Sequence, residues 1–300
     1  MMFFILAPAS MVAQETPVFR AGVTLVRVDV QVVDRGRNVT DLTAADFEVY
    51  DDGRPQKISF FGRETEPLDL VLLLDVSGSM HRSLNEMAGA AQAALGALHE
   101  GDRVAVMLFA RRAALRREFT ADFGAVRQEI RDAVKDQNLG SGTAIYSAII
   151  EAANYAAKAP LRGRRAVLIV TDNLSLNYQV TDEQVIRALY RADAVLNAIL
   201  TGKAARPDEP KPGRYVNPDF IPSDVFKLAE QTGGEAVEAR QVGESFREMV
   251  ERIRARYGLQ YEAPASPAGA FHRVEVRLTP AARKRYPRAA VRARAGYHAD

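Results

Sequence analysis

Apolar residues follow two different periods along the chain, and these divide it into three parts. In residues 20–65, polar and apolar residues alternate, which predicts half-buried β-strands. In residues 66–256, continuous apolar runs such as 70–74 alternate with amphipathic stretches such as 80–99. Such runs predict parallel strands buried on both faces, with helices between them. Strict alternation returns in residues 257–300.

This order predicts an α/β fold class. The central part should form a doubly wound, mostly parallel, Rossmann-like sheet, flanked by an antiparallel β-sandwich. Neither terminal β segment holds enough strands to be stable alone. We therefore expect residues 257–300 to pair with residues 20–65 around an inserted central domain.

The same patterns predict the elements. We expect helices at 80–99, 123–134, 144–159, from 181, at 221–231 and at 244–257. Beside the run that ends at residue 74, central strands are expected at 103–109, 113–119, 165–172, 194–200 and 235–238. Terminal strands are expected at 23–34, 47–50, 57–61, 258–262, 272–278 and 291–297, with the basic run 283–288 as a solvated loop and strand face.

Three oxygen-bearing side chains follow the first buried run, in the pattern Asp75-x-Ser77-x-Ser79. Alternate residues of an extended turn point the same way, so these oxygens can converge on one hard cation. Mg²⁺ prefers about six oxygen ligands, so more donors are needed. A glycine-rich loop supplies Thr143, and a second buried strand ends at Asp172. Open parallel sheets place sites at the carboxyl ends of strands, where the strand order reverses.

These five residues resemble the metal-ion-dependent adhesion site of von Willebrand factor type A domains, as found in bacterial proteins that carry such a domain between β segments. The resemblance covers roughly residues 66 to 256. It implies that Asp75, Ser77, Ser79, Thr143 and Asp172 hold a divalent cation, directly or through water, and that an acidic side chain of a partner completes the shell. The expected cofactor is Mg²⁺, with Mn²⁺ or Ca²⁺ as alternatives. One departure is Asn173, where the family often has Gly.

Each ligand also has a purely structural interpretation. Ser77, Ser79 and Thr143 are suited to helix N-caps, and Asp172 to a turn. All five in register within an α/β pattern favour the metal interpretation.

Two segments should border the same edge of the sheet. Arg111 and Arg112 form a turn that could add contacts to an acidic partner, or could simply be solvated. The proline-rich residues 203–213 form a long loop that either contributes to partner choice or is a mobile surface loop. Near the N-terminus, Asp51-Asp52-Gly53 could suggest calcium, but we interpret it as a hairpin turn.

Composition narrows the class of partner. The chain has 300 residues, 47% of them hydrophobic and 26% charged, with 40 Lys and Arg against 38 Asp and Glu. A formal charge of +2 gives no reason to expect nucleic acid. The absence of Cys excludes disulfides and thiolate metal sites.

The first 14 residues are apolar, then small, then polar, which predicts a signal peptide and hence export to the periplasm, cell envelope or exterior. A basic n-region is missing, so a plain N-terminal tail is the alternative. The run is too short to span a bilayer, and we expect no transmembrane span.

Enzyme chemistry finds little support in the sequence. Phosphoryl transfer would need a second carboxylate and a Lys near Asp75, where Ser77 and Ser79 stand instead. The nucleotide motif G-x-G-x-x-G and the nucleophile motif G-x-S-x-G lack their contexts, and none of the four His has a supporting context.

We therefore predict a metal-dependent protein-binding or adhesion module that captures an acidic residue of a partner. The alternative is a structural or assembly module of the cell envelope in which the metal only stabilises the fold. Regulation of a chaperone-type ATPase is a third possibility.

Overall fold

A six-stranded sheet forms the centre of the molecule. The computed structural model describes residues 24–63, 66–135, 139–175, 180–202 and 223–299. Five neighbouring strands of the central sheet are parallel, and only the edge strand β8 is antiparallel. In spatial order the strands are β11 (Ala236–Glu238), β10 (Ala194–Leu200), β9 (Arg164–Thr171), β6 (Leu68–Asp75), β7 (Arg103–Phe109) and β8 (Ala113–Thr120).

The apolar runs explain why the middle of this sheet is buried on both faces. Every residue of β6 and β9 is buried. Successive strands add first on the β7 side of β6 and later on its β9 side, so the strand order reverses at β6. The carboxyl ends of β6 and β9 therefore flank the switch point at which open α/β sheets bind ligands.

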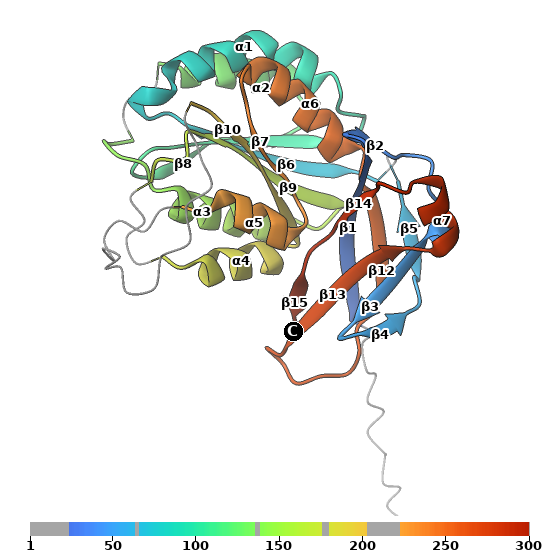
Figure 1. The fold of residues 1–300 in the computed structure, drawn as a ribbon. Coiled ribbons are helices and arrows are strands. Elements are labelled where there is room, and N and C mark those ends of the chain that lie inside the picture. The colour runs from blue at the N-terminus through green and yellow to red at the C-terminus, as the bar shows by residue number, and fades with distance from the viewer. Residues whose placement is uncertain (1–23, 64–65, 136–138, 176–179, 203–222, 300) are drawn as a thin grey trace, which may run out of the picture.

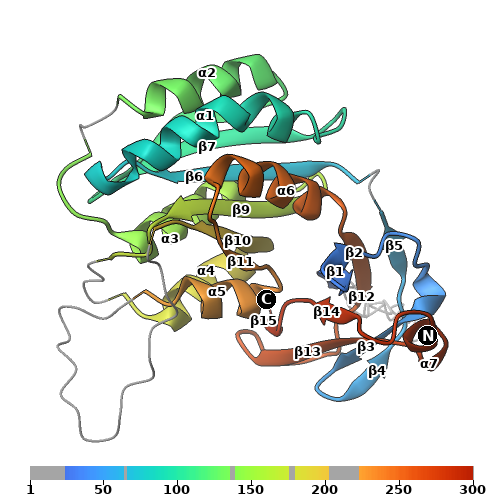
Figure 2. The ribbon, with the colours of Figure 1, turned by 45° about the horizontal axis from the view of Figure 1, so that its top comes forward.

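Six helices cover the two faces of the sheet (Figures 1 and 2). Their apolar stripes pack on the strand side chains and form one core on each face. One face carries α1 (His81–Leu95), which follows the short 3-10 helix η2 (Gly78–Met80), with α2 (Phe123–Ala133) and α6 (Val242–Arg254). The other face carries α3 (Ile145–Lys158), α4 (Asp182–Arg191) and α5 (Val225–Thr232).

The two ends of the chain form an antiparallel sandwich beside this domain (Figure 1). Alternating apolar side chains from both ends fill its core. One sheet contains β14 (Ala290–Arg292), β1 (Leu25–Asp34), β12 (Tyr257–Glu262) and β5 (Phe60–Gly62), with β2 (Arg37–Asn38) against β1. The other contains β15 (Gly296–His298), β13 (Phe271–Leu278), β3 (Phe47–Asp51) and β4 (Arg54–Gln56); the 3-10 helix η1 (Ala44–Asp46) precedes β3.

The predicted fold class is confirmed: a doubly wound, mostly parallel sheet with a sandwich built from both terminal segments. The domain boundaries at residues 66 and 256 remain predictions. The signal peptide of residues 1–14 and the loop 203–213 lie outside the described residues. Within the described part of the chain, no helix is long and apolar enough to cross a membrane.

Several local predictions were wrong. The single strand expected at 57–61 is replaced by β4 and β5, which belong to different sheets, and 291–297 likewise divides into β14 and β15. Each crossing between sheets interrupts the ladder. The last helix of the central domain ends at Arg254, and Tyr257 already begins β12.

The basic run 283–288, predicted as a solvated loop and strand face, overlaps a short helix, α7 (Pro280–Arg285). Thr279 is its N-cap and accepts a hydrogen bond from the Ala282 N–H, and Pro280 occupies the first turn, where its missing N–H is not needed.

Candidate metal centre

The carboxylate of Asp75 lies at the carboxyl end of β6 and is fully buried. Its Oδ1 accepts a hydrogen bond from the Ser77 N–H at 2.9 Å, and its Oδ2 accepts one from the Thr171 hydroxyl at 2.7 Å. Burial raises the pKa of Asp75 to about 6, and the Asp172 carboxylate adds to the rise while hydrogen bonds from Thr171 and Ser77 oppose it. A cation held at this carboxylate would favour its ionised form.

Two loops bring the next three oxygens together. Ser77 Oγ lies 3.3 Å from Ser79 Oγ, and Ser79 donates a hydrogen bond of 2.6 Å to Asp172 Oδ2. Ser79 is exposed, whereas the Asp172 side chain is largely buried and its Oδ1 also accepts from the Leu174 N–H. The loops after β6 and β9 thus meet in a group of oxygens that is open to solvent on one side.

Thr143 is linked through its backbone carbonyl to the loop that carries Asp172. The Ser175 hydroxyl donates to Thr143 O at 3.1 Å and accepts from the Ile145 N–H at 3.4 Å. Ser175 therefore ties the Thr143 loop and the start of α3 to the loop that carries Asp172. Within the described residues, no hydrogen bond joins the Thr143 hydroxyl to the other four predicted ligands.

The structural alternatives for these residues fit only in part. Ser77 occupies the N-cap of η2, but its side chain makes no capping bond, and the N-cap of α3 is Ala144 rather than Thr143. Asp172 does form the predicted turn through Leu174 N. Asn173 adopts φ +59°, a left-handed conformation that Asn tolerates and that explains why Gly suits this position.

The predicted rim lies against the glycine-rich loop. Arg111 and Arg112 are exposed, and the Arg112 N–H donates to Leu139 O at 3.3 Å. Gly140 has φ +87°, and a Cβ there would lie 3.3 Å from Arg111 Cβ. These contacts place the Arg111–Arg112 turn beside the loop that leads to Thr143.

Sequence reasoning missed two residues of this site. Thr171 was interpreted as part of an apolar strand, and Ser175 was given no role. The useful signal for Thr171 is its position: β6 and β9 are parallel neighbours, and Leu74 is opposite Val170. The hydroxyl that ends β9 therefore comes level with the carboxylate that ends β6.

The donor set is chemically suited to a hard divalent cation. Every candidate ligand atom is an oxygen, two are carboxylates and three are neutral hydroxyls, as Mg²⁺ and Mn²⁺ prefer. The short contact between Ser79 and Asp172 shows that donors from both loops already converge. The oxygens of Ser77, Ser79 and Asp172 therefore suit a divalent cation beside Asp75, which Thr171 and the Ser77 N–H orient.

An open, mostly parallel sheet with oxygen donors at its switch point defines the class of protein: an α/β domain with a candidate metal centre. Residues 70–174 match the family model of the von Willebrand factor type A domain. Over these residues the chain is similar to a von Willebrand factor type A domain. No curated protein matches the chain.

Several solved structures are similar to parts of the chain at low sequence identity. A von Willebrand factor type A protein from Catenulispora acidiphila is 14% identical, with a TM-score of 0.46, and the match covers 93% of this chain and 75% of that one. An aerotolerance-related membrane protein from Bacteroides fragilis is 16% identical, with a TM-score of 0.46, covering 62% of this chain and 98% of that one. Proximal thread matrix protein 1 from the mussel byssus, solved with zinc in its MIDAS motif, is 15% identical, with a TM-score of 0.48, covering 69% of this chain and 50% of that one.

Proposed function

We propose that this protein is a metal-dependent protein-binding module. In this proposal Asp75, Ser77, Ser79, Thr143 and Asp172 hold one divalent cation, with Mg²⁺ as the expected ion and Mn²⁺ or Ca²⁺ as alternatives. The observation that carries the proposal is the convergence of Ser77, Ser79 and Asp172 oxygens from two loops beside the buried Asp75.

The donor set explains what such a site would recognise. Three of its five ligands are neutral hydroxyls, so a bound cation would remain electrophilic and attract an anionic oxygen from outside. The exposed side at Ser79 admits such a group. We therefore propose that an Asp or Glu of a partner protein completes the shell. Arg111 and Arg112, exposed beside the glycine-rich loop, would add charge-assisted contacts to an acidic partner.

Recognition accounts for these residues better than catalysis does. No Lys or His, and no carboxylate beyond the two candidate ligands Asp75 and Asp172, is among the groups that contact Asp75, Ser79 or Asp172 in the described chain. We propose that the protein is exported and binds its partner in the periplasm, envelope or exterior. Fractionation of cells that express the full chain, with the mass of the mature N-terminus, tests this location.

The experiment is a pull-down from an envelope extract with added Mg²⁺ or with EDTA, together with calorimetric titration of Mg²⁺. Ser79→Ala should abolish both Mg²⁺ binding and capture, because it removes an exposed ligand without disturbing the core. Ser83→Ala, on α1 one turn further along, is the matched control and should bind like the wild type. Capture that persists in excess EDTA would contradict the proposal. A metal that raises the melting temperature of the protein without affecting capture would favour the alternative, a structural module of the envelope in which the metal only stabilises the fold.

A further inference from the structure

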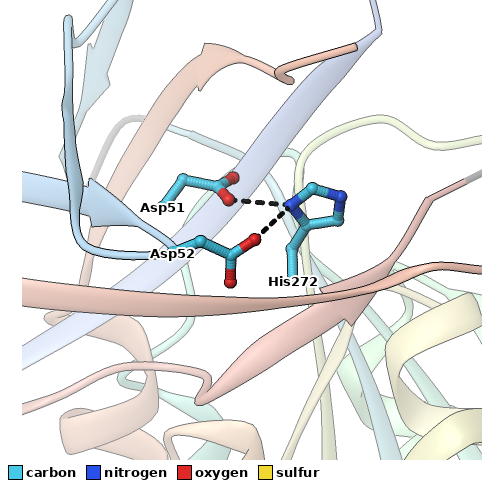
Figure 3. Close-up of side chains that lie close together, drawn as sticks. All are labelled: Asp51, Asp52 and His272. Carbon is cyan, nitrogen blue, oxygen red and sulfur yellow. Dashed lines mark hydrogen bonds and ion pairs between the residues drawn. The ribbon is translucent and has the colours of Figure 1, made fainter. Parts of the chain in front are cut away.

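Asp51, Asp52 and His272 converge in the sandwich, within the terminal β segments and apart from the candidate metal centre. The β3–β4 turn brings the two carboxylates beside His272 of β13, as Figure 3 shows. His272 Nδ1 lies 2.9 Å from Asp51 Oδ1 and 3.0 Å from Asp52 Oδ2. The sequence indicated a plain turn, because no further ligand follows the two Asp at the spacing of a calcium loop. His272 lies 220 or more positions further along the chain.

The turn is held firmly against β13. Asp52 N donates to Arg273 O, and Arg273 N donates to Asp52 Oδ1, both at 2.9 Å. Asp52 has φ +47° and Gly53 φ +77°, the left-handed pair of a tight hairpin turn. Asp52 Oδ2 is therefore aimed at the imidazole by backbone contacts on its other oxygen.

A second layer orients the buried carboxylate. Tyr261 and Tyr297 both donate to Asp51 Oδ2, at 2.7 and 2.9 Å. Burial, followed by the hydrogen bond to Asp51, raises the pKa of both phenols, so both remain protonated donors at neutral pH. The Tyr297 ring also stacks on the His272 ring, with centroids 5.0 Å apart. Only Asp51 Oδ1 is left to face His272.

Charge is unbalanced at this point. Two carboxylates share one imidazole, and among the described residues no Arg or Lys forms an ion pair with Asp51 or Asp52. The cluster is negative whether His272 is neutral or protonated, and the Asp51 side chain is completely buried. Buried charges are normally paired or bound to metal.

We propose that Asp51, Asp52 and His272 form a second divalent-cation site, of the mixed nitrogen and oxygen type that Zn²⁺ prefers. The three ligand atoms all lie within 4.8 Å of one another, so small side-chain shifts would bring them to the roughly 2.0–2.2 Å that Zn²⁺ requires of each ligand. Imidazole favours Zn²⁺ over Mg²⁺ or Ca²⁺. The Asp52 side chain is 52% exposed, which provides an entry path and room for a water as fourth ligand.

Binding would make Nδ1 of His272 a ligand in place of a hydrogen-bond donor. A protonated imidazole would release its Nδ1 proton to solvent and keep the proton on Nε2, whereas a neutral imidazole protonated at Nδ1 would carry its single proton on Nε2 instead. Nε2 is buried and has no hydrogen-bond partner among the described residues, so Nδ1 is the ring nitrogen that faces the two carboxylates. The tyrosines supply the outer contacts that ligating carboxylates usually have.

Such a site would join the two ends of the chain. Asp51 and Asp52 come from the N-terminal hairpin, and His272 from the C-terminal segment that pairs with it. The inference does not depend on the candidate metal centre, because no residue is shared.

Zn²⁺ titration of the full-length chain by calorimetry tests the inference. Asp52→Asn should remove one equivalent of bound Zn²⁺ or weaken that site by more than the roughly 10–100-fold that loss of an outer partner costs. Asn tolerates the left-handed turn and can still accept from Arg273 N, so the fold should persist. Glu275→Gln, which neutralises an exposed carboxylate on β13, the strand that carries His272, is the matched control.

Imidazole ¹⁵N NMR gives a second readout. Zn²⁺ should shift the Nδ1 resonance of His272, identified by its loss in His272→Gln, and should not do so in Asp52→Asn. Equal stoichiometry and affinity in Asp52→Asn and Glu275→Gln, or an unshifted His272 resonance in the wild type at saturating Zn²⁺, would overturn the site.

Discussion

Asp75 depends on a single neighbouring hydroxyl for one of its two oxygens. Thr171→Val keeps the shape of the buried side chain and removes the donor to Asp75 Oδ2. A buried carboxylate that loses a partner should lower the free energy of unfolding by about 1–3 kcal/mol. Mg²⁺ affinity should fall roughly 10–100-fold, as for other outer-shell losses. Urea unfolding and calorimetric Mg²⁺ titration measure the two effects.

The conservative variant separates packing from hydrogen bonding. Thr171→Ser keeps the hydroxyl and should retain most of the Mg²⁺ affinity, even if the loss of a methyl group costs stability. Equal Mg²⁺ affinities for the Ser and Val variants would mean that the Thr171 hydroxyl does not orient Asp75.

Candidate site residues could be predicted where they lie close together in the sequence, at a recognisable spacing. Asp75, Ser77 and Ser79 lie within five positions, so their pattern is visible without a structure. Thr171 and Ser175 act through contacts with residues 96 and 32 positions away. A Thr at the end of an apolar strand has ordinary β propensity, and nothing local distinguishes it from a packing residue.

At the scale of elements, η1 is held by a capping box that also reaches the C-terminal segment. Asp46 accepts from Thr43 N at 2.8 Å and from the Thr43 hydroxyl at 3.0 Å, and Arg285 of α7 lies 2.8 Å from its other oxygen. Burial alone would raise the pKa of Asp46, but these contacts outweigh it and hold the pKa below its ordinary value. The ionised form is therefore the one that stabilises the fold.

Asp46→Ala should cost about 1–3 kcal/mol of unfolding free energy at neutral pH, because a buried capping contact and an ion pair are lost together. A lowered folded-state pKa contributes stability above the unfolded-state pKa of about 3.9 and loses it as pH falls through the folded value. The difference in unfolding free energy between the wild type and Asp46→Ala should therefore become smaller in acid. Urea unfolding from neutral pH downwards measures it, and a gap that stays constant would contradict the assignment.

Long elements were predictable and short ones were not. The six helices of the central domain show a clear apolar stripe over two or more turns, so periodicity found them all. β4, β5, β14 and β15 have three residues each, too few to establish a period or to show a change of sheet. α7 had readable signals in Thr279 and Pro280, but its basic residues suggested a solvated surface.

At the scale of the whole molecule, the pairing of the two terminal segments into a sandwich could be predicted, because neither segment would be stable alone. Two β segments that are too small to fold alone must find each other, and β1 pairs with β12 as β3 pairs with β13. The junction with the central domain was not predictable, because it is built from buried arginines. Arg164, Arg254, Arg256 and Arg294 are all buried between the two parts, and Arg is ordinarily a surface residue.

Arg164 links three parts of the chain at this junction. It begins β9, donates to Ile253 O and Arg254 O at the end of α6 at 3.0 and 2.8 Å, and lies 3.6 Å from Asp29 of β1. These contacts supply the last carbonyls of α6 with a donor and fix the helix directly before the chain enters β12. Arg256 forms a second ion pair with Asp29 from the other side of this connection.

Arg164→Met should therefore destabilise more than the central domain. Removing one partner of a buried charge network typically costs 3–5 kcal/mol, and here the loss also frees the helix end that positions β12. Urea unfolding should show the full cost, and hydrogen exchange should speed up at the end of α6 and in β1 as well as in β9. The double variant with Asp29→Asn should cost less than the sum of the single variants, because the two side chains stabilise each other. Strict additivity, with exchange changed only in β9, would mean that the contact between Arg164 and Asp29 does not couple the sandwich to the central domain.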